Sequence, residues 1–315
     1  MININLKNAV AYKDMNISAK RKKLSVILLV TNISMLFIAS ILLLSYNGAL
    51  AIYQTISADN FIIAFNVIVI VECVLLCMSI PGLTAPLIAN ERERQTLDVL
   101  LTTKMSYFEI IIGKYTSALC YVFLILITSL PFLSLTLVYG GVSFKDLICV
   151  FLTIVVMILY LTSFGVFFST ICKKTAAANI LTLFVFAFLI FGTCLIVLIA
   201  YLLSINYDLY SGTTYTMRER IADALFFILY LNPAATVFDT LDLTTGFSLT
   251  STANGMAFFV SSFTQNINSS GIFVRFWSLI SCILQLIVSF LMLHFSAKML
   301  DPSRRRYHGR KNKVS

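Results

Sequence analysis

Side chains that could bind a metal or act as catalysts are scarce in this sequence. His294 and His308 are the only histidines among the 315 residues, and neither has other donors nearby at the spacing of a metal site. The seven cysteines all lie in or at the edge of apolar runs, which argues against a disulfide framework. Cys73 and Cys77 stand one helical turn apart, and we interpret them as small core residues. The sequence therefore predicts no metal and no cofactor in this chain.

A charged string is the most informative feature for function. Residues 91–94 read Glu-Arg-Glu-Arg, and leucines follow at helical spacing, so the stretch combines alternating charge with an apolar ridge. Ser106, with Glu109 three residues later, is the capping-box pattern that begins a helix. We expect an amphipathic helix over 90–106 that docks on another protein; the alternative is an ordinary solvated loop. The expected docking residues are Glu91, Arg92, Glu93, Arg94, Thr96, Leu97, Asp98, Leu100, Leu101, Ser106 and Glu109.

The composition indicates where such a segment would lie. Apolar residues make up 59% of the sequence, charged residues make up 12%, and the mean hydropathy is +0.92. Soluble domains carry about 25% charged residues. This chain therefore cannot cover a water-facing surface, and the same numbers exclude a disordered protein. We predict an all-α polytopic membrane protein.

Six apolar stretches are long enough to cross a bilayer, which takes about 20 helical residues. The N-terminal segment lacks the pattern of a cleavable signal peptide, so we expect the first stretch to be a span of the mature protein. The expected spans are residues 24–46, 61–89, 108–139, 147–172, 179–203 and 273–299, between a basic amphipathic segment at 1–23 and a basic tail at 300–315.

The positive charges predict the orientation. Most lysines and arginines fall in the N-terminal segment, after the second and fourth spans, and in the C-terminal tail. The other side holds Lys145, Arg218, Arg220 and Arg275. By the positive-inside rule, both termini and the 90–106 segment are expected to be cytosolic. We interpret the basic ends as contacts with anionic membrane lipid and not as nucleic-acid-binding tails.

The segment before the last span is expected to lie on the outer side, at residues 204–271. Its most apolar part, residues 221–238, would place the basic tail outside the cell if it crossed the membrane. Asn232-Pro233 interrupts this part, because proline lacks the amide proton and clashes one turn back in a helix. We therefore expect a re-entrant or outer-leaflet helix here.

Glu72 is a carboxylate in the middle of the second expected span. At that depth an ionised carboxylate costs several kcal/mol unless it is paired or protonated, so it indicates a functional site by default. With Asn66 and Gln285 it forms a possible intramembrane polar site. The alternative, equally open, is a neutral carboxylic acid bonded to a neighbouring helix through Gln285 or a serine.

The string ANERERQTLDVLLTTKMSYFEIIIGK, at residues 89–114, resembles the coupling segment of type-2 ABC exporter permeases. The layout of six spans and the string YLNPAATVFDTL at 230–241 are also similar to that family. Three positions depart from the family pattern: Gln95 replaces the usual Gly, Asp98 replaces Glu, and Lys104 stands where Pro is common. We therefore expect the helix in this segment to begin and end slightly differently.

The resemblance implies a permease that is driven by a separate ABC ATPase chain, which would hold the ATP and magnesium. The sequence agrees, since Gly113-Lys114 is followed by Tyr115 where a phosphate-binding loop needs Ser or Thr, and Phe108 stands in place of its first Gly. The resemblance also implies a second permease half, identical or related, and a bacterial plasma membrane. Charge reversal at Glu91 and Glu93 is then expected to lower ATP-driven transport without preventing membrane insertion.

Two other functions remain open at this point. A non-transporting sensor or assembly scaffold of the same fold would dock the same ATPase without moving cargo. An intramembrane enzyme is less well supported, because a metalloprotease needs His and acidic clusters inside the spans. Only His294 and Glu72 are available there, and they lie far apart in the chain.

Overall fold

The computed structural model describes residues 22–50, 58–97, 106–138, 142–199, 228–245 and 276–300, and all the regular structure in these ranges is helical. The basic N-terminal segment, the basic tail, most of the 204–271 segment and docking residues 98–105 lie outside this description.

Six helical segments are long and apolar enough to cross a membrane, as the sequence predicted. The segments are Leu24–Ile41, Phe61–Glu93, Tyr107–Val138, Phe144–Ile171, Thr175–Ile199 and Trp277–Leu300. They belong to helices α2 (Lys22–Leu50), α3 (Ala58–Thr84) with the short α4 (Ala89–Glu93), α6 (Tyr107–Val138), α7 (Phe144–Ile171), α8 (Thr175–Ala187) with a π-helical turn η2 (Phe188–Gly192), and α14 (Trp277–Leu300).

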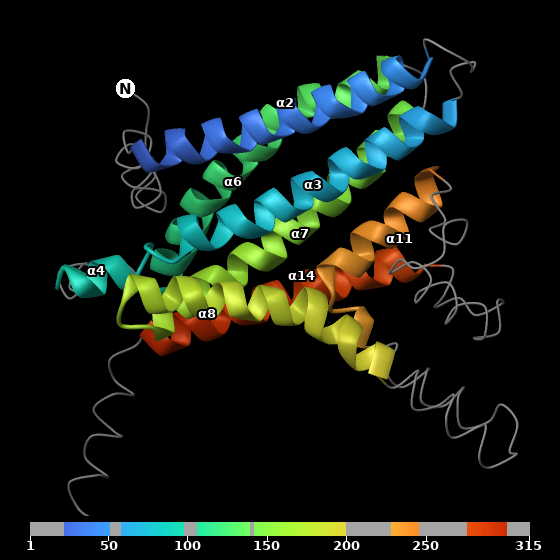
Figure 1. Cartoon of the computed structure of the whole chain (residues 1–315). Coiled ribbons are helices and arrows are strands. Elements are labelled where there is room, and N and C mark those ends of the chain that lie inside the picture. The colour runs from blue at the N-terminus through green and yellow to red at the C-terminus, as the bar shows by residue number, and fades with distance from the viewer. Residues whose placement is uncertain are drawn as a thin grey trace, which may run out of the picture.

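The long helices run side by side, and α4 projects at one end of the bundle (Figure 1). We call this the α4 end. Helix α2 begins there, α14 finishes there, and the turn between α7 and α8 lies beside α4 (Figure 1). Helices α2 and α6 finish at the opposite end, and α3 and α7 begin there (Figure 1).

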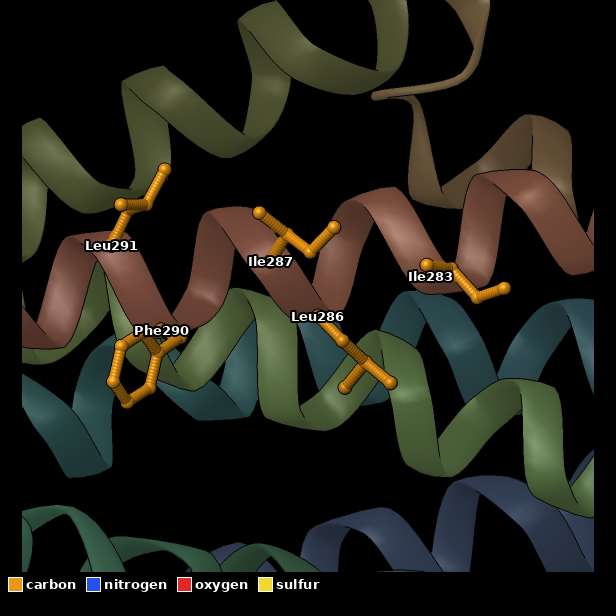
Figure 2. A pocket seen from close by; sticks show the side chains of 5 residues that line it. All are labelled: Ile283, Leu286, Ile287, Phe290 and Leu291. Atoms are coloured by element: carbon orange, nitrogen blue, oxygen red, sulfur yellow. The ribbon is translucent and has the colours of Figure 1, made fainter.

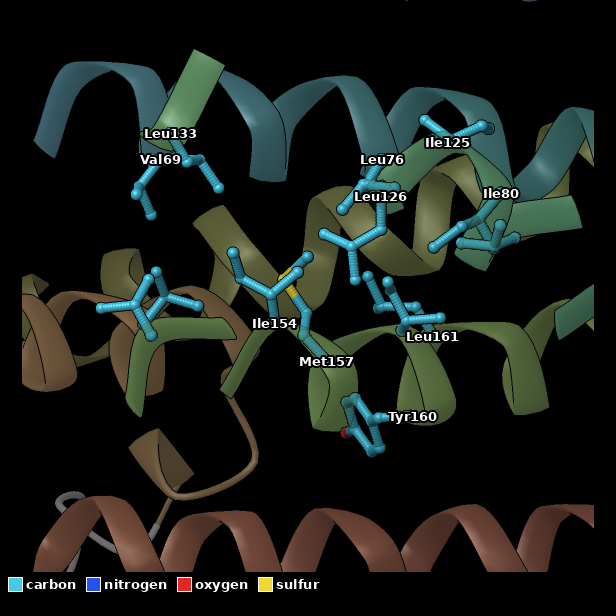
Figure 3. Close-up of a cluster of buried hydrophobic side chains, with 14 of the residues drawn as sticks. Val69, Leu76, Ile80, Ile125, Leu126, Leu133, Ile154, Met157, Tyr160 and Leu161 are labelled. Carbon is cyan, nitrogen blue, oxygen red and sulfur yellow. The ribbon is translucent and has the colours of Figure 1, made fainter. Parts of the chain in front are cut away.

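Helix α7 is the centre of the bundle. Of its apolar window 56% is buried inside the protein, against 22% for the windows of α2, α8 and α14. The main hydrophobic cluster lies where α7 meets α3 and α6, and Figure 3 shows Leu76, Leu126 and Leu161 meeting from these three helices. The outer faces of α2, α8 and α14 are apolar and exposed, which suits contact with lipid.

Local interactions explain where α7 begins and where it ends. Ser143 and Asp146 form a capping box at its start, in which Ser143 Oγ accepts from the Lys145 amide at 3.2 Å and Asp146 Oδ2 accepts from the Ser143 amide at 3.1 Å. At the other end the backbone leaves the helix at Cys172, in an extended conformation. The last carbonyls of α7 therefore lie directly beside α4.

A shorter helix, α11 (Pro233–Thr245), packs against α7 and α14 and is not among the candidate spans. It begins deep in the bundle and ends at the opposite end from α4 (Figure 1). The chain breaks at Asn232-Pro233, as the sequence predicted: residues 230–231 form a turn and Pro233 is the first residue of α11. Residues 221–227 lie outside the described part of the chain.

Candidate functional site

The start of α4 is built on α7 through a single serine. Ser169 Oγ donates to the Ala85 carbonyl at 2.8 Å and accepts from the Ile88 and Ala89 amides at 3.0 and 3.2 Å. These amides belong to the turn before α4 and to its first residue, so they have no carbonyl of their own helix to bond. Ser169 is fully buried, and it satisfies these groups without water.

Glu91 forms an ion pair with Lys114, a lysine in the second turn of α6. Lys114 Nζ lies 2.5 Å from Glu91 Oε1, and the lysine side chain is 4% exposed. A buried cation is tolerated when an anion and further hydrogen bonds accompany it, so Glu91 is needed for Lys114 to remain inside the protein. The pair joins α4 to α6.

Arg92 and Glu93 join α4 to the two helices on its other side. Arg92 Nη1 donates to the carbonyls of Cys172 at 3.0 Å and Ile171 at 3.3 Å, which are the unsatisfied carbonyls at the end of α7. Glu93 Oε1 accepts from the Thr175 amide at 2.8 Å, and Glu93 Oε2 accepts from the Thr175 hydroxyl at 3.1 Å. Thr175 is the first residue of α8, where a carboxylate also interacts favourably with the helix dipole.

Gln95 ends the α4 region in the left-handed conformation, with φ at 58°. Side chains are disfavoured there because Cβ crowds the following carbonyl, and glycine avoids this crowding. The segment from Glu91 is therefore not one continuous helix: α4 ends at Glu93, and the chain turns at Arg94 and Gln95. The resembled pattern has Gly at the position of Gln95. The left-handed turn seen here explains why glycine suits that position.

The other predicted docking residues divide between exposed and structural positions. Arg94 is exposed and bonds Asn90 of its own helix at 3.3 Å. Thr96 is exposed and donates back to the Glu91 carbonyl. Leu97 is buried and packs with Ile110. Asp98, Leu100 and Leu101 lie outside the described residues.

Ser106 and Glu109 form the predicted capping box at the start of α6. Glu109 Oε2 accepts from the Ser106 amide at 3.0 Å, and Ser106 Oγ accepts from the Glu109 amide at 3.2 Å. These two residues therefore start a span, and their hydrogen bonds are made within the chain.

Glu72, Asn66 and Gln285 have separate partners and are not brought together in one site. The Glu72 carboxyl has Ser129 of α6 as its side-chain partner, so the serine alternative describes it better than Gln285. Asn66 Oδ1 accepts from Thr245 at the end of α11, at 3.3 Å. Gln285 Nε2 donates to Thr236 at 2.8 Å and to Ser281 at 3.1 Å. Each group joins two neighbouring helices, and Gln285 belongs to the network that holds α11 on α14.

Asn232 is a site residue that sequence reasoning treated only as a helix break. Its Oδ1 accepts from the Ala234 and Ala235 amides at 2.9 and 3.2 Å, which makes it the cap of α11. Its Nδ2 donates to Thr193 at 2.8 Å and to the Ile190 carbonyl in η2 at 3.1 Å. One amide side chain therefore begins α11 and fixes it to the π-helical turn after α8.

Asp239 is a half-buried carboxyl on α11. Its pKa is raised from 3.8 to about 6, chiefly by burial and also by the nearby Asp242, while hydrogen bonds from Ser278 oppose the rise. Burial also raises the pKa of Asp242. Ser278 follows the first residue of α14, so Asp239 joins α11 to the start of that helix.

The rest of the described surface offers little chemistry. A shallow hollow of about 350 Å³ on α14 is lined by five apolar side chains, and Figure 2 shows them along the helix: Ile283, Leu286, Ile287, Phe290 and Leu291. None of them can form a side-chain hydrogen bond, so the hollow suits hydrocarbon. Among the described residues, no three His, Cys, Asp or Glu side chains gather closely enough to hold a metal ion.

Sequence reasoning did not identify most of the residues that hold α4 in place. Ser169, Thr175 and the carbonyl of Cys172 give no local signal, because any apolar helix carries such groups. Lys114 does give one: a lysine inside an apolar span needs an acidic partner. In the described residues that partner is Glu91.

Comparison with known proteins agrees with this architecture. A family model described as "ABC-2 family transporter protein" matches residues 8–295. The matched range includes all the described helices except the last residues of α14. A search of curated proteins finds no match.

Proposed function

The chain belongs to the ABC-2 family of transporter membrane proteins, and we propose that it is the membrane-spanning half of an ATP-driven exporter. Proteins of this family lack an ATPase domain, so the chain is a multi-pass permease component and not itself an enzyme. ABC-2 permeases generally pair with an ABC ATPase and typically lack cofactors. The nucleotide and its magnesium would accordingly be bound by the partner chain.

The α4 end is proposed to face the cytosol. Among the described residues, the basic residues at this end belong to α2, α4, α6, the α7–α8 turn and α14, whereas Lys145 alone lies at the opposite end. This distribution supports the positive-inside orientation, because short loops rich in Lys and Arg stay in the cytosol. Both termini would then also be cytosolic, and α11 would insert from the outer side.

The ATPase is proposed to dock on α4 and the segment that follows it, residues 90–106. The observation that carries this proposal is the position of α4, which projects at one end of the bundle (Figure 1) and is bonded to α6, α7 and α8 at once. A helix with these three connections can pass a rigid-body displacement to most of the bundle. Arg94, directly after this helix, is exposed and is available to a partner.

A second permease half is proposed to complete the translocation path. Helices α2, α8 and α14 leave most of their apolar windows uncovered, so part of this surface is free to pack against another half. The second half would be the same chain or a related permease.

Purification from native membranes in the presence of ATP and vanadate tests the proposal. An ABC ATPase should be recovered with the wild-type chain, together with one permease partner. Arg94→Glu should recover much less ATPase, because a reversed charge in an interface costs several kcal/mol when it faces a like charge. Lys145→Glu, a charge reversal at an exposed position at the opposite end of the bundle, is the matched control and should leave recovery unchanged. A wild-type chain that recovers no ATPase would contradict the proposal.

A further inference from the structure

The segment from the end of α3 through α4 lies along α7 and the start of α8, and four successive contacts hold it there. Thr84 lies against Gly165, where a Cβ on the glycine would come within 2.7 Å of Thr84 Cβ. Next along α7, Ser169 holds the turn before α4. Beyond it are the bonds from Arg92 to the end of α7 and from Thr175 at the start of α8 to Glu93.

These contacts leave little freedom between the two segments. The hydrogen bonds of Arg92, and that of the Thr175 amide to Glu93, reach backbone atoms of α7 and α8, so a rotamer change in α7 or α8 cannot release them. Gly165 of α7 also lies so close to the Thr84 side chain of α3 that a larger residue at this position would clash with it. Toward α6, the polar connection of α4 is the ion pair of Glu91 with Lys114, which joins two side-chain ends.

We propose that Arg92 and Glu93 are positioning residues that fix α4 to the α7–α8 turn, so that a displacement of α4 moves the adjoining ends of α7 and α8 together. The inference rests on the proposed function, because the ATPase supplies the displacement. It adds the route by which the motion enters the membrane: through the fourth and fifth spans and not only through α6, which follows α4 in the sequence. Because α7 is the most buried span, this route reaches the centre of the bundle directly.

Glu93 has two roles that the experiment must separate. It satisfies the first amide of α8, which stabilises that helix, and it also connects α8 to α4. The N-cap residue of α8, Lys174, has no side-chain bond to the helix amides. An aspartate at position 174 would cap α8 locally without any connection to α4. Adding Lys174→Asp to Arg92→Ala/Glu93→Ala therefore restores the cap of α8 without restoring the connection to α4.

Hydrogen–deuterium exchange of the purified complex with its ATPase in lipid nanodiscs tests the inference without knowledge of the cargo. Exchange is measured with and without ATP plus vanadate in peptides covering 84–93 and 165–187. In the wild type, nucleotide should change exchange in both regions. In Arg92→Ala/Glu93→Ala the change at 84–93 should remain and the change at 165–187 should be lost. Basal exchange at the first amides of α8 should also rise about fivefold, as expected for one lost hydrogen bond.

Two further variants are controls, one for the removal of a charge from the turn and one for the lost cap of α8. Lys173→Ala removes an exposed charge in the same turn and should keep both nucleotide responses. Arg92→Ala/Glu93→Ala/Lys174→Asp should return basal exchange in α8 to the wild-type rate but should still lack the nucleotide response there. A response at 165–187 that survives in Arg92→Ala/Glu93→Ala, or returns with Lys174→Asp, overturns the inference. A wild-type complex with no ATPase and no response at 84–93 instead refutes the proposed function.

Discussion

Gln95 shows how one residue can shape the junction beside α4. Its φ of 58° places the chain in a conformation that costs most residues about 1 kcal/mol or more. The turn that it makes follows α4 directly and leads to Leu97, which packs on the cluster around Ile110. A residue that resists this conformation should therefore disturb both α4 and its packing.

We expect Gln95→Gly to leave stability unchanged or slightly raised and Gln95→Val to lower it by about 1–2 kcal/mol. Valine is β-branched and tolerates a positive φ poorly, whereas glycine adopts it without steric conflict. The apparent unfolding temperature of the detergent-purified protein measures the difference. Equal unfolding temperatures for the two variants would show that the left-handed conformation does not constrain this position.

The ion pair of Glu91 and Lys114 gives a second prediction at this scale. Glu91→Ala leaves Lys114 buried without its anion and should destabilise the protein by about 2–3 kcal/mol, below the full penalty because Glu91 is partly exposed. Glu91→Leu/Lys114→Met removes both charges and should recover most of that loss. Thermal unfolding of the single and double variants provides the comparison, and additive losses would refute the pairing. Charge reversal at Glu91 should accordingly affect folding as well as transport.

Residues whose partners stand within one helical turn were predictable, and the others were not. Ser106 with Glu109 and the break at Asn232-Pro233 follow from local chemistry that the sequence displays. The partners of Arg92 and Glu93 lie on other helices, and their positions depend on how the spans pack. Long-range hydrogen bonds of this kind leave no periodic pattern in one sequence.

At the scale of elements, the crossing of α3 and α7 sets the position of the junction. Gly165 of α7 lies against the side chain of Thr84 of α3, just before the turn held by Ser169. Gly192 offers a comparison, because its added Cβ would meet the ring of Phe188 at a similar 2.7 Å. The Phe188 ring is exposed and can rotate away, whereas Thr84 is buried.

Gly165→Ala should therefore destabilise the protein by about 1–3 kcal/mol, and Gly192→Ala should have a much smaller effect. The first substitution pushes α3 from α7 and displaces the start of α4, so it should also reduce recovery of the ATPase. Thermal unfolding and the pull-down described above measure both effects. A milder effect at Gly165 than at Gly192 would argue against a close helix crossing.

The contact of α11 with α14 predicts a pH dependence of stability through Asp239. Because burial raises the pKa of this carboxyl in the folded protein to about 6, the stabilisation is complete below its ordinary 3.8 and is lost as the pH rises through about 6. The unfolding temperature should therefore be higher at pH 5 than at pH 7.5, by the equivalent of about 1.4 kcal/mol. Asp239→Asn, which remains neutral, should reduce this dependence, and an unchanged profile would assign it to other groups.

At the scale of the whole molecule, the six-span layout was predictable because a bilayer imposes length and hydrophobicity on every crossing segment. The placement of α11 was only partly predictable, because a polar helix inside the bundle has no such signature. It is held there by hydroxyl and amide groups, such as Thr236 bonded to Ser281 and Thr153 bonded to Thr240. These bonds join residues that are far apart in the sequence.

The orientation of the whole chain can be tested by labelling single cysteines in a variant that lacks the seven natural ones. Lys145 and Lys173 are both exposed and lie at opposite ends of the bundle. A membrane-impermeant maleimide on intact cells should label Lys145→Cys and not Lys173→Cys, and both should react after permeabilisation. The reverse result would place α4 outside the cell and rule out docking of a cytosolic ATPase.

Packing between α7 and α14 has a consequence for biosynthesis. Helix α14 contacts α7 more extensively than any other helix does, yet it is the last described helix in the chain. A ribosome that adds roughly 5–20 residues per second completes α7 several seconds before α14. During that interval the buried side of α7 must face lipid or an insertion factor. Nascent chains stopped before Trp277 should therefore be selective targets for membrane proteases, even though five spans have already been inserted.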